Sequence, residues 1–222
     1  MTERQDAVVI IGASYVRGWA LKEIAGIRII NKGVNGEQSF EMLRRFEQDV
    51  IALNPKAVII WGYINDIFRS EKADLQNKLD SSRENMGKMV EAARAHHILP
   101  ILVSEATVCG QRGLKEYVAA LAGRLLGKES YQEYVNKHVW VVNGWLREYS
   151  RESNVALLDF EKVLADETGA RKKEYAEADG SHISPRGYEK LNAYVRTHSE
   201  LFTKSVDCIV ADAPSKENDK SS

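Results

Sequence analysis

The sequence predicts an α/β fold, a three-layer α/β/α sandwich around a mostly parallel sheet of about five strands. Short apolar runs rich in Val, Ile and Leu, each bounded by Gly, Asn, Pro or a charge, are typical of strands buried on both faces. Helical patterns lie between these runs, and such alternation implies right-handed βαβ units. The predicted strands are Ala7–Gly12, Ile27–Asn31, Ala57–Trp61, Leu99–Val103 and, with a weaker pattern, Val155–Asp159.

Three helices are predicted from apolar residues spaced three or four positions apart, which share one helix face. The first helix ends at Asn54-Pro55, because proline cannot continue it. His138 lies on an apolar face, where we expect a histidine satisfied in the core or at its boundary. The three faces consist of Leu43, Phe46, Val50 and Leu53; of Leu75, Leu79, Met86, Val90 and Ala93; and of Tyr131, Val135, His138, Val142, Trp145 and Tyr149.

Length and composition suit a single domain. The chain has 222 residues, of which 44% are hydrophobic and 28% charged, enough to bury one core without disulfides or a metal. We predict one domain over residues 1–204 and a polar C-terminal tail over residues 205–222, disordered from about residue 213. The net charge is −1 with both signs interspersed, so the basic surface that a nucleic-acid partner needs is not expected.

The sequence also predicts a cytoplasmic location. Cys109 and Cys208 lie far apart and match no metal or redox spacing, which favours thiols in a reducing compartment. The apolar run at Ala7–Ile11 is too short for the hydrophobic part of a signal peptide and leads straight into a motif. No membrane span is expected, because no stretch approaches the ~20 apolar residues that a span needs.

Polar, glycine-marked segments follow three of the predicted strands, and a fourth lies near the C-terminus. Ligands in such sheets bind beyond the carboxyl ends of the strands, so we expect these segments to meet at one rim. The segments are Gly12-Ala13-Ser14-Tyr15, Asn31 to Gly36, Gly62 to Asp66, and Asp179-Gly180-Ser181-His182.

The side chains in these segments are chemically complementary. Ser14 is a weak nucleophile on its own, and His182 would supply the general base that it needs. Asp179, three residues earlier on the same loop, would fix the tautomer of that histidine and stabilise its charged form. The Ser14 amide, the Gly36 amide and the Asn65 side chain could together donate to a developing oxyanion.

These segments resemble the consensus blocks of the SGNH (GDSL) hydrolase superfamily, in that family's order, from residue 8 to about residue 195. The resemblance implies Ser14 as nucleophile and oxyanion donor, Gly36 and Asn65 as further oxyanion donors, and Asp179 and His182 as acid and base. It also implies a flavodoxin-like arrangement of the fold, a small-molecule ester as substrate, and no cofactor or metal.

The sequence departs from the family pattern at three positions. Ala13 replaces the usual acidic residue before the serine, and Pro185 stands later than the proline that often follows the histidine. The third block contains one extra residue, because Gly62 stands three residues before Asn65 rather than two. That extra residue leaves the path of the Gly62–Asn65 loop open.

Two further segments allow two interpretations each. The run Arg171-Lys172-Lys173 could bind an anionic group of the substrate, but a solvated run of charges is the interpretation we adopt. Residues 105–131 follow the fourth strand and contain several glycines around apolar residues. They could form a wall or lid of the site, or an ordinary packing helix.

The function predicted is hydrolysis of a carboxylic ester through an acyl-enzyme at Ser14. Acyl esters of small molecules, sugars or lipids are all compatible with the sequence, since fold-level analogy does not select a substrate. Two alternatives remain: an acyltransferase that uses the same acyl-enzyme, and a catalytically silent carbohydrate-binding or scaffold module of the same fold.

Overall fold

The computed structural model describes residues 4–110 and 129–202 of the chain. Its middle layer is a six-stranded sheet in the order β2-β3-β1-β4-β5-β6. Neighbouring strands are parallel throughout, except that β2 runs antiparallel to β3. The strands are β1 (Gln5–Gly12), β2 (Glu23–Ile24), β3 (Ile27–Gly33), β4 (Pro55–Trp61), β5 (Leu99–Val103) and β6 (Ala156–Leu158).

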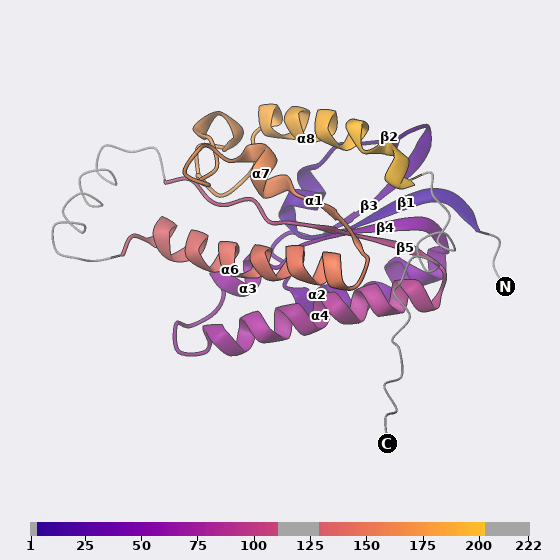
Figure 1. Cartoon of the computed structure of the whole chain (residues 1–222), viewed down its shortest axis with the longest axis horizontal. Helices are drawn as coiled ribbons and strands as arrows, with labels where there is room; N and C mark the ends of the chain where they lie inside the picture. The colour runs from indigo at the N-terminus through magenta and orange to yellow at the C-terminus, as the bar shows by residue number, and fades with distance from the viewer. Residues whose placement is uncertain (1–3, 111–128, 203–222) are drawn as a thin grey trace, which may run out of the picture.

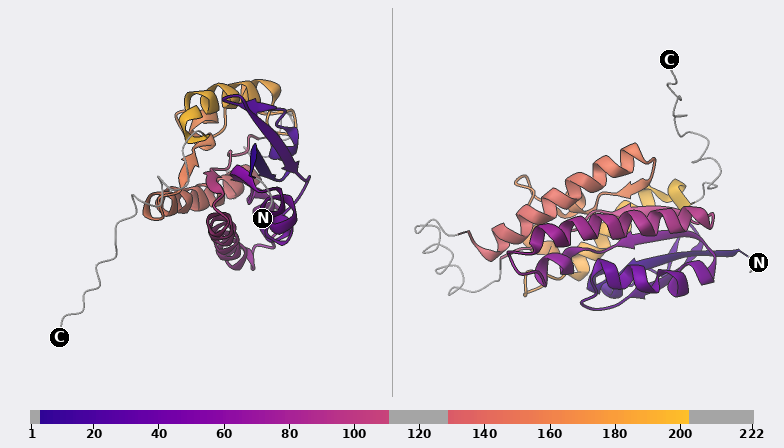
Figure 2. Two further views of the ribbon diagram at one scale, coloured as in Figure 1. Left: turned by 90° about the vertical axis from the view of Figure 1, so that its right-hand side faces the viewer. Right: turned by 90° about the horizontal axis from the view of Figure 1, so that it is seen from below.

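Helices cover both faces of this sheet. Helices α1, α7 and α8 lie on one face and α2, α4 and α6 on the other, as the views in Figure 1 and Figure 2 show. The predicted three-layer α/β/α class is therefore confirmed. The helices are α1 (Ser14–Gly18), α2 (Ser39–Asp49), α3 (Ile64–Phe68), α4 (Leu75–Ala95), α6 (Tyr131–Glu152), α7 (Phe160–Leu164) and α8 (Pro185–Thr197), with 3₁₀ turns η1 (Ile51–Leu53), η2 (Lys173–Tyr175) and η3 (Ser199–Phe202).

The core lies on both sides of the central strands. Ala7 to Gly12 of β1 and all of β5 are buried, as expected for strands covered on both faces. On the face covered by α1 and α7, Trp61 packs edge-on against Trp19 and Phe160, with ring centroids 5.7 and 4.9 Å apart. This apolar packing fixes the turn after β1 against the sheet.

The order of the strands determines where a site can form. β1 lies between β3 and β4, and Gly12 at its end is level with Gly33 of β3 and Trp61 of β4. The chain passes to one side of β1 to form β3 and then to the other side to form β4. Loops at such a switch point diverge and leave a crevice at the carboxyl ends of the strands.

The structure differs from the prediction in three elements. The sheet has six strands rather than about five, because β2 is only two residues long and carries no apolar run. The first predicted helix ends at Asp49, continues as η1, and stops at Asn54 in the left-handed conformation with φ of 44°. Pro55 then opens β4. The weak fifth run is a strand of three residues, β6.

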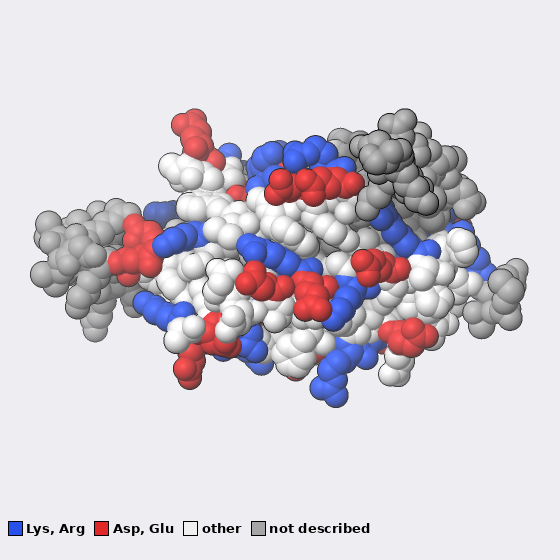
Figure 3. Space-filling model, turned by 60° about the horizontal axis from the view of Figure 1, so that its bottom comes forward, with Lys and Arg blue, Asp and Glu red and all other residues white. Residues whose placement is uncertain are grey.

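Charges of both signs intermix on the face of the molecule drawn in Figure 3. Within residues 4–110 and 129–202, no helix is long and apolar enough to cross a membrane. The tail predicted over residues 205–222, including its predicted disorder and Cys208, lies outside the described residues.

Candidate active site

Ser14 lies at the carboxyl end of the central strand, where a serine nucleophile was predicted. Gly12 ends β1, Ala13 precedes the helix, and Ser14 is the first residue of α1. The amide of a residue at this position has no partner within its own helix and can donate to a ligand. Asn31 of β3 holds the turn, since its Nδ2 donates to the carbonyls of Val16 and Trp19 at 2.6 and 3.0 Å.

Asp179 and His182 form a direct pair. Nδ1 of His182 and Oδ2 of Asp179 are 2.5 Å apart, and Oδ1 of Asp179 accepts the amides of Ser181 and His182 at 2.9 Å each. The pairing is thus local to one turn, as the spacing of the two residues predicted. Both side chains remain about half exposed, at 46% for Asp179 and 52% for His182, so a substrate can reach them.

The pKa of Asp179 is held low by this turn. Partial burial opposes ionisation, but the hydrogen bonds from the His182 side chain and from the His182 and Ser181 amides lower the pKa to about 2. The group is therefore a carboxylate at neutral pH, the form that can orient an imidazole and stabilise its positive charge.

The turn that carries Ser14 contacts the loop that carries His182. Tyr15 donates its hydroxyl to the carbonyl of Ser181 at 2.6 Å, and Tyr188 of α8 donates to the carbonyl of Tyr15 at 2.8 Å. The rings of Tyr15 and His182 meet edge to face, with centroids 6.5 Å apart. The residues that directly follow Ser14 and directly precede His182 are therefore in contact.

Gly36 adopts a backbone conformation that favours glycine. Its φ is +72°, and a Cβ built there would lie 2.4 Å from Nη2 of Arg69. The adjacent Glu37 is buried and forms an ion pair with Arg45 of α2, which also donates to the carbonyl of Lys32 at 2.8 Å. The loop after β3 is thereby fixed at the same rim as Ser14.

Asn65 lies beside the Gly36 loop, despite the extra residue in its own loop. Its Nδ2 donates to the carbonyl of Glu37 at 2.9 Å. A primary amide has two N–H groups, so the second can donate to a ligand. The neighbouring polar side chains face elsewhere: Asp66 accepts the amide and hydroxyl of Ser39, and the Tyr63 hydroxyl bonds within the core. Among these three side chains, it is therefore Asn65 that bonds to Glu37, next to Gly36.

A buried glutamate that the sequence analysis did not single out holds the extra residue of this loop. Glu105 accepts the amides of Tyr63 and Ile64 at 2.9 and 3.4 Å and the indole N–H of Trp61 at 3.1 Å. Burial raises the pKa of Glu105 to about 7, against the lowering effect of these hydrogen bonds and of Arg171. Glu105 is the second residue after the end of β5, so the strand-end rule that selected Ser14 also points to it.

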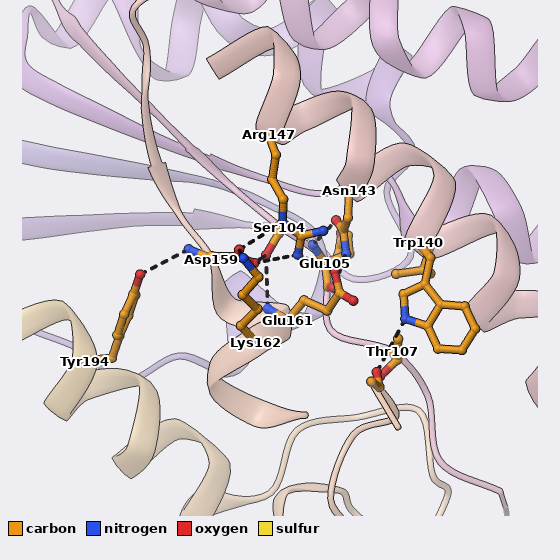
Figure 4. Close-up of polar contacts among 12 residues, drawn as sticks. Ser104, Glu105, Thr107, Trp140, Asn143, Arg147, Asp159, Glu161, Lys162 and Tyr194 are labelled. Atoms are coloured by element: carbon orange, nitrogen blue, oxygen red, sulfur yellow. Dashed lines mark hydrogen bonds and ion pairs between the residues drawn. The ribbon is translucent and has the colours of Figure 1, made fainter. Parts of the chain in front are cut away.

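Glu105 belongs to a larger polar network, drawn in Figure 4. Asn143 of α6 accepts the Glu105 amide and donates to the Glu105 carbonyl, at 2.9 Å each, and also donates to Glu161 at 2.6 Å. Arg147 pairs with Asp159 and Glu161 at 2.8 and 2.6 Å. The network joins the Gly62–Asn65 loop to α6 and to the start of α7.

The interpretation of Arg171-Lys172-Lys173 as a solvated run is wrong for its first residue. Arg171 is buried, at 2% exposed, whereas Lys172 and Lys173 are exposed as predicted. The three basic residues look alike in the sequence, and only the tertiary packing separates them. Arg171 lies against the loop of residues 179–182.

Part of the segment of residues 105–131, for which a wall or lid of the site was one interpretation, lies within the described residues. Residues Glu105 to Val108 are buried, and Asn136 of α6 bonds both backbone groups of Val108. Cys109 then donates its amide to the Gly180 carbonyl at 2.8 Å. Residues 111–128 lie outside the described part of the chain. Within that part, no three His, Cys, Asp or Glu side chains are grouped to hold a metal ion.

The sequence of the chain matches a known family and individual relatives. The pattern of the GDSL-like lipase/acylhydrolase family matches residues 12–190. The uncharacterized lipoprotein YqeF of Bacillus subtilis is 25% identical over 175 residues, which cover 74% of this chain and 70% of that protein. An acetylxylan esterase of Geobacillus stearothermophilus is 46% identical over 44 residues, only 20% of this chain and 20% of that protein.

Solved structures resemble the fold. A GDSL-like lipase from Bacteroides thetaiotaomicron superposes with a TM-score of 0.67 at 22% identity, covering 88% of both chains. An acetylxylan esterase from Geobacillus stearothermophilus superposes with a TM-score of 0.61 at 17% identity, covering 93% of this chain and 98% of that chain. Since the family pattern extends over most of the domain, this chain belongs to the GDSL-like lipase/acylhydrolase family and is a hydrolase of ester bonds.

Proposed function

We propose that the protein hydrolyses a carboxylic ester by two acyl-transfer steps through Ser14. The observation that carries this proposal is the Asp179–His182 pair, 2.5 Å apart, on a loop that contacts the turn of Ser14. Nucleophile, base and orienting carboxylate are the parts that this chemistry needs.

In the first step, the Ser14 hydroxyl attacks the ester carbonyl carbon while Nε2 of His182 takes its proton. The carbonyl oxygen becomes an oxyanion, to which the Ser14 and Gly36 amides and the Asn65 side chain donate. Collapse of this intermediate breaks the bond to the alcohol, which leaves with the proton from His182. Water, deprotonated by the same histidine, then attacks the acyl-enzyme and releases the acid.

We further propose a short acyl chain, such as acetyl, as the group transferred. The local sequence match to an acetylxylan esterase supports this choice. An acetyl ester of nitrophenol is therefore the first substrate to assay, followed by acetylated sugars. Added glycerol would reveal acyl transfer to an alcohol as a second product.

Replacing Ser14 tests the proposal. Ser14→Ala should lower hydrolysis of the nitrophenyl ester by a factor of ~10³ or more while the protein stays folded, because the acyl-enzyme can no longer form. A fluorophosphonate probe should label Ser14 in the wild type and leave Ser14→Ala unlabelled. Ser81→Ala, on the exposed side of α4, is the matched control and should keep both activity and labelling.

Two results would contradict the proposal. One is full activity in folded Ser14→Ala. The other is a label that maps to Ser181, whose hydroxyl lies 3.4 Å from Nδ1 of His182, the ring nitrogen that faces Asp179. Nucleophilic activation needs the opposite nitrogen, Nε2, which is why Ser181 is expected to stay unlabelled.

A further inference from the structure

Arg171 is buried directly beside the loop that carries the acid–base pair. Its Nη2 donates to the carbonyl of Gly180 at 3.1 Å and to the carbonyl of Ser181 at 2.7 Å. These are the two carbonyls between Asp179 and His182. A single guanidinium nitrogen thus holds both carbonyls in the middle of the loop.

The same guanidinium lies against the turn of Ser14. Its central carbon is 5.8 Å from the centroid of the Tyr15 ring, a cation–π contact. Tyr15 donates its own hydroxyl to the Ser181 carbonyl at 2.6 Å, so Tyr15 and Arg171 converge on one acceptor. Burial raises the pKa of Tyr15 to about 12, and the phenol therefore remains a donor at all working pH values.

The two carbonyls that Arg171 contacts do not depend on it alone for a hydrogen bond. Each carbonyl has a second donor, the Cys109 amide for Gly180 and the Tyr15 hydroxyl for Ser181. Nε and Nη1 of Arg171 are buried without a hydrogen-bond partner among the described residues. A buried charge with unsatisfied donors costs free energy, which offsets part of what these contacts contribute to stability.

We propose that Arg171 is a positioning residue that orients the Asp179–His182 loop toward Ser14. This inference rests on the proposed ester hydrolysis. The Asp179–His182 pair itself depends on a turn within the loop, because Asp179 accepts the amides of Ser181 and His182. Loss of Arg171 therefore leaves the pair formed but leaves the Gly180 and Ser181 carbonyls with only the Cys109 amide and the Tyr15 hydroxyl as donors among the described residues, so the loop is held less firmly relative to Ser14.

Two variants separate positioning from folding. Arg171→Met keeps the volume and removes the donors, and its kcat should fall ~10- to 100-fold, since a shift of ~1 Å at reacting groups has such an effect. KM should change less than about twofold, because Arg171 does not contact the substrate. The melting temperature should stay within ~4 °C of the wild type. Arg171→Lys should recover part of kcat, because an ammonium can still donate to the two carbonyls.

Arg186→Met is the matched control. Arg186 is the second residue of α8, close to the loop in sequence, and forms an exposed ion pair with Glu174 at 3.1 Å. Exposed pairs contribute little, so this variant should keep the wild-type kcat and melting temperature.

Hydrogen exchange gives a second readout that does not need activity. In Arg171→Met, amides of residues 176–184 should exchange faster than in the wild type, while Arg186→Met should leave them unchanged. Folded Arg171→Met with kcat within twofold of the wild type, or with unchanged exchange in this segment, would overturn the inference. Failure of the proposed function looks different: wild-type protein without fluorophosphonate labelling at Ser14 would refute it, and exchange would still decide the role of Arg171.

Discussion

At the scale of single residues, contacts between distant parts of the chain hold the loops of the candidate site together. Asn65 donates to Glu37, and Tyr15 beside the nucleophile donates to Ser181. Only the Asp179–His182 pair is local in sequence. The site is thus preorganised by contacts between loops, the condition under which oxyanion donors contribute most to catalysis.

Removing the Asn65 side chain tests the third oxyanion donor. Asn65→Ala should lower kcat by ~10²–10³ with little change in KM, because the donor acts on charge that develops in the transition state. Steady-state kinetics on the nitrophenyl ester measure both parameters. Asn77→Ala, an exposed asparagine on α4, should behave as the wild type. Unchanged kcat in folded Asn65→Ala would mean that backbone amides suffice and that the third-block assignment is wrong.

The candidate site residues could be predicted from the sequence for a physical reason that does not apply to the residues that hold them in place. Ser14, Gly36 and Asn65 each follow a strand, and a strand is recognisable from its own residues. Arg171 is buried where it packs against Tyr15 and the loop of residues 179–182, whereas its two neighbours in the sequence have the same chemistry and are exposed. Burial of this kind is a tertiary property, which no local pattern reports.

At the scale of elements, the loops after β3 and β4 are joined at the start of α2. Asp66 of α3 accepts the Ser39 amide at 2.9 Å and the Ser39 hydroxyl at 2.9 Å, and Asn85 of α4 donates to the same hydroxyl at 3.0 Å. Ser39 is the first residue of α2, so Asp66 satisfies a donor that the helix itself leaves unpaired. This contact places α3, and with it Asn65, relative to the Gly36 loop.

Asp66→Ala should therefore destabilise the protein. It leaves a buried helix-end amide and a buried hydroxyl without their acceptor, at a cost of about 2–4 kcal/mol in unfolding free energy. Urea unfolding measures this loss. Asp74→Ala is the control, because Asp74 precedes α4 but makes no capping bond to it, and a change below ~0.5 kcal/mol is expected. Equal effects of the two substitutions would show that Asp66 does not cap α2.

Element boundaries were less predictable than element types. The helix that bears Phe46 was expected to run on to Asn54, but it ends at Asp49 and tightens into a 3₁₀ turn. The apolar spacing continues through η1, since both kinds of helix can bury the same residues. β2 was missed because a strand of two residues gains its pairing from β3 and has no periodicity of its own.

At the scale of the whole molecule, two buried ionisable side chains, Glu105 and Arg171, link the site to the stability of the fold. Glu105 is 1% exposed and accepts hydrogen bonds from Trp61, Tyr63 and Ile64. Arg171 is the charged group that most favours its ionised form. Burial still dominates, so ionising Glu105 costs free energy in the folded chain that it does not cost in the unfolded chain.

The sign of the resulting pH dependence is fixed by the two pKa values. The pKa of Glu105 is 4.5 in an ordinary environment and about 7 when buried in the fold. Between these pH values the unfolded chain has released the proton and the folded chain still holds it. The unfolded state thus binds fewer protons, and the unfolding free energy falls as pH rises. The contribution of protonated Glu105 to the unfolding free energy is fully present below pH 4.5 and is lost by about pH 7.

Glu105→Gln should remove this dependence, because glutamine has the shape of the protonated acid and does not titrate. The stability of the variant relative to the wild type should therefore rise by up to ~3 kcal/mol between pH 4.5 and pH 7, the equivalent of the shift in pKa. Urea unfolding of both proteins across this range gives the difference directly, and other titrating groups cancel in it. Burial lowers the pKa of His138, so the titration of this histidine makes the unfolding free energy rise with pH. This effect is the same in both proteins. A difference that stays constant from pH 4.5 to pH 7 would mean that Glu105 is already ionised in the fold, with the loop of Tyr63 and Ile64 stabilising the carboxylate.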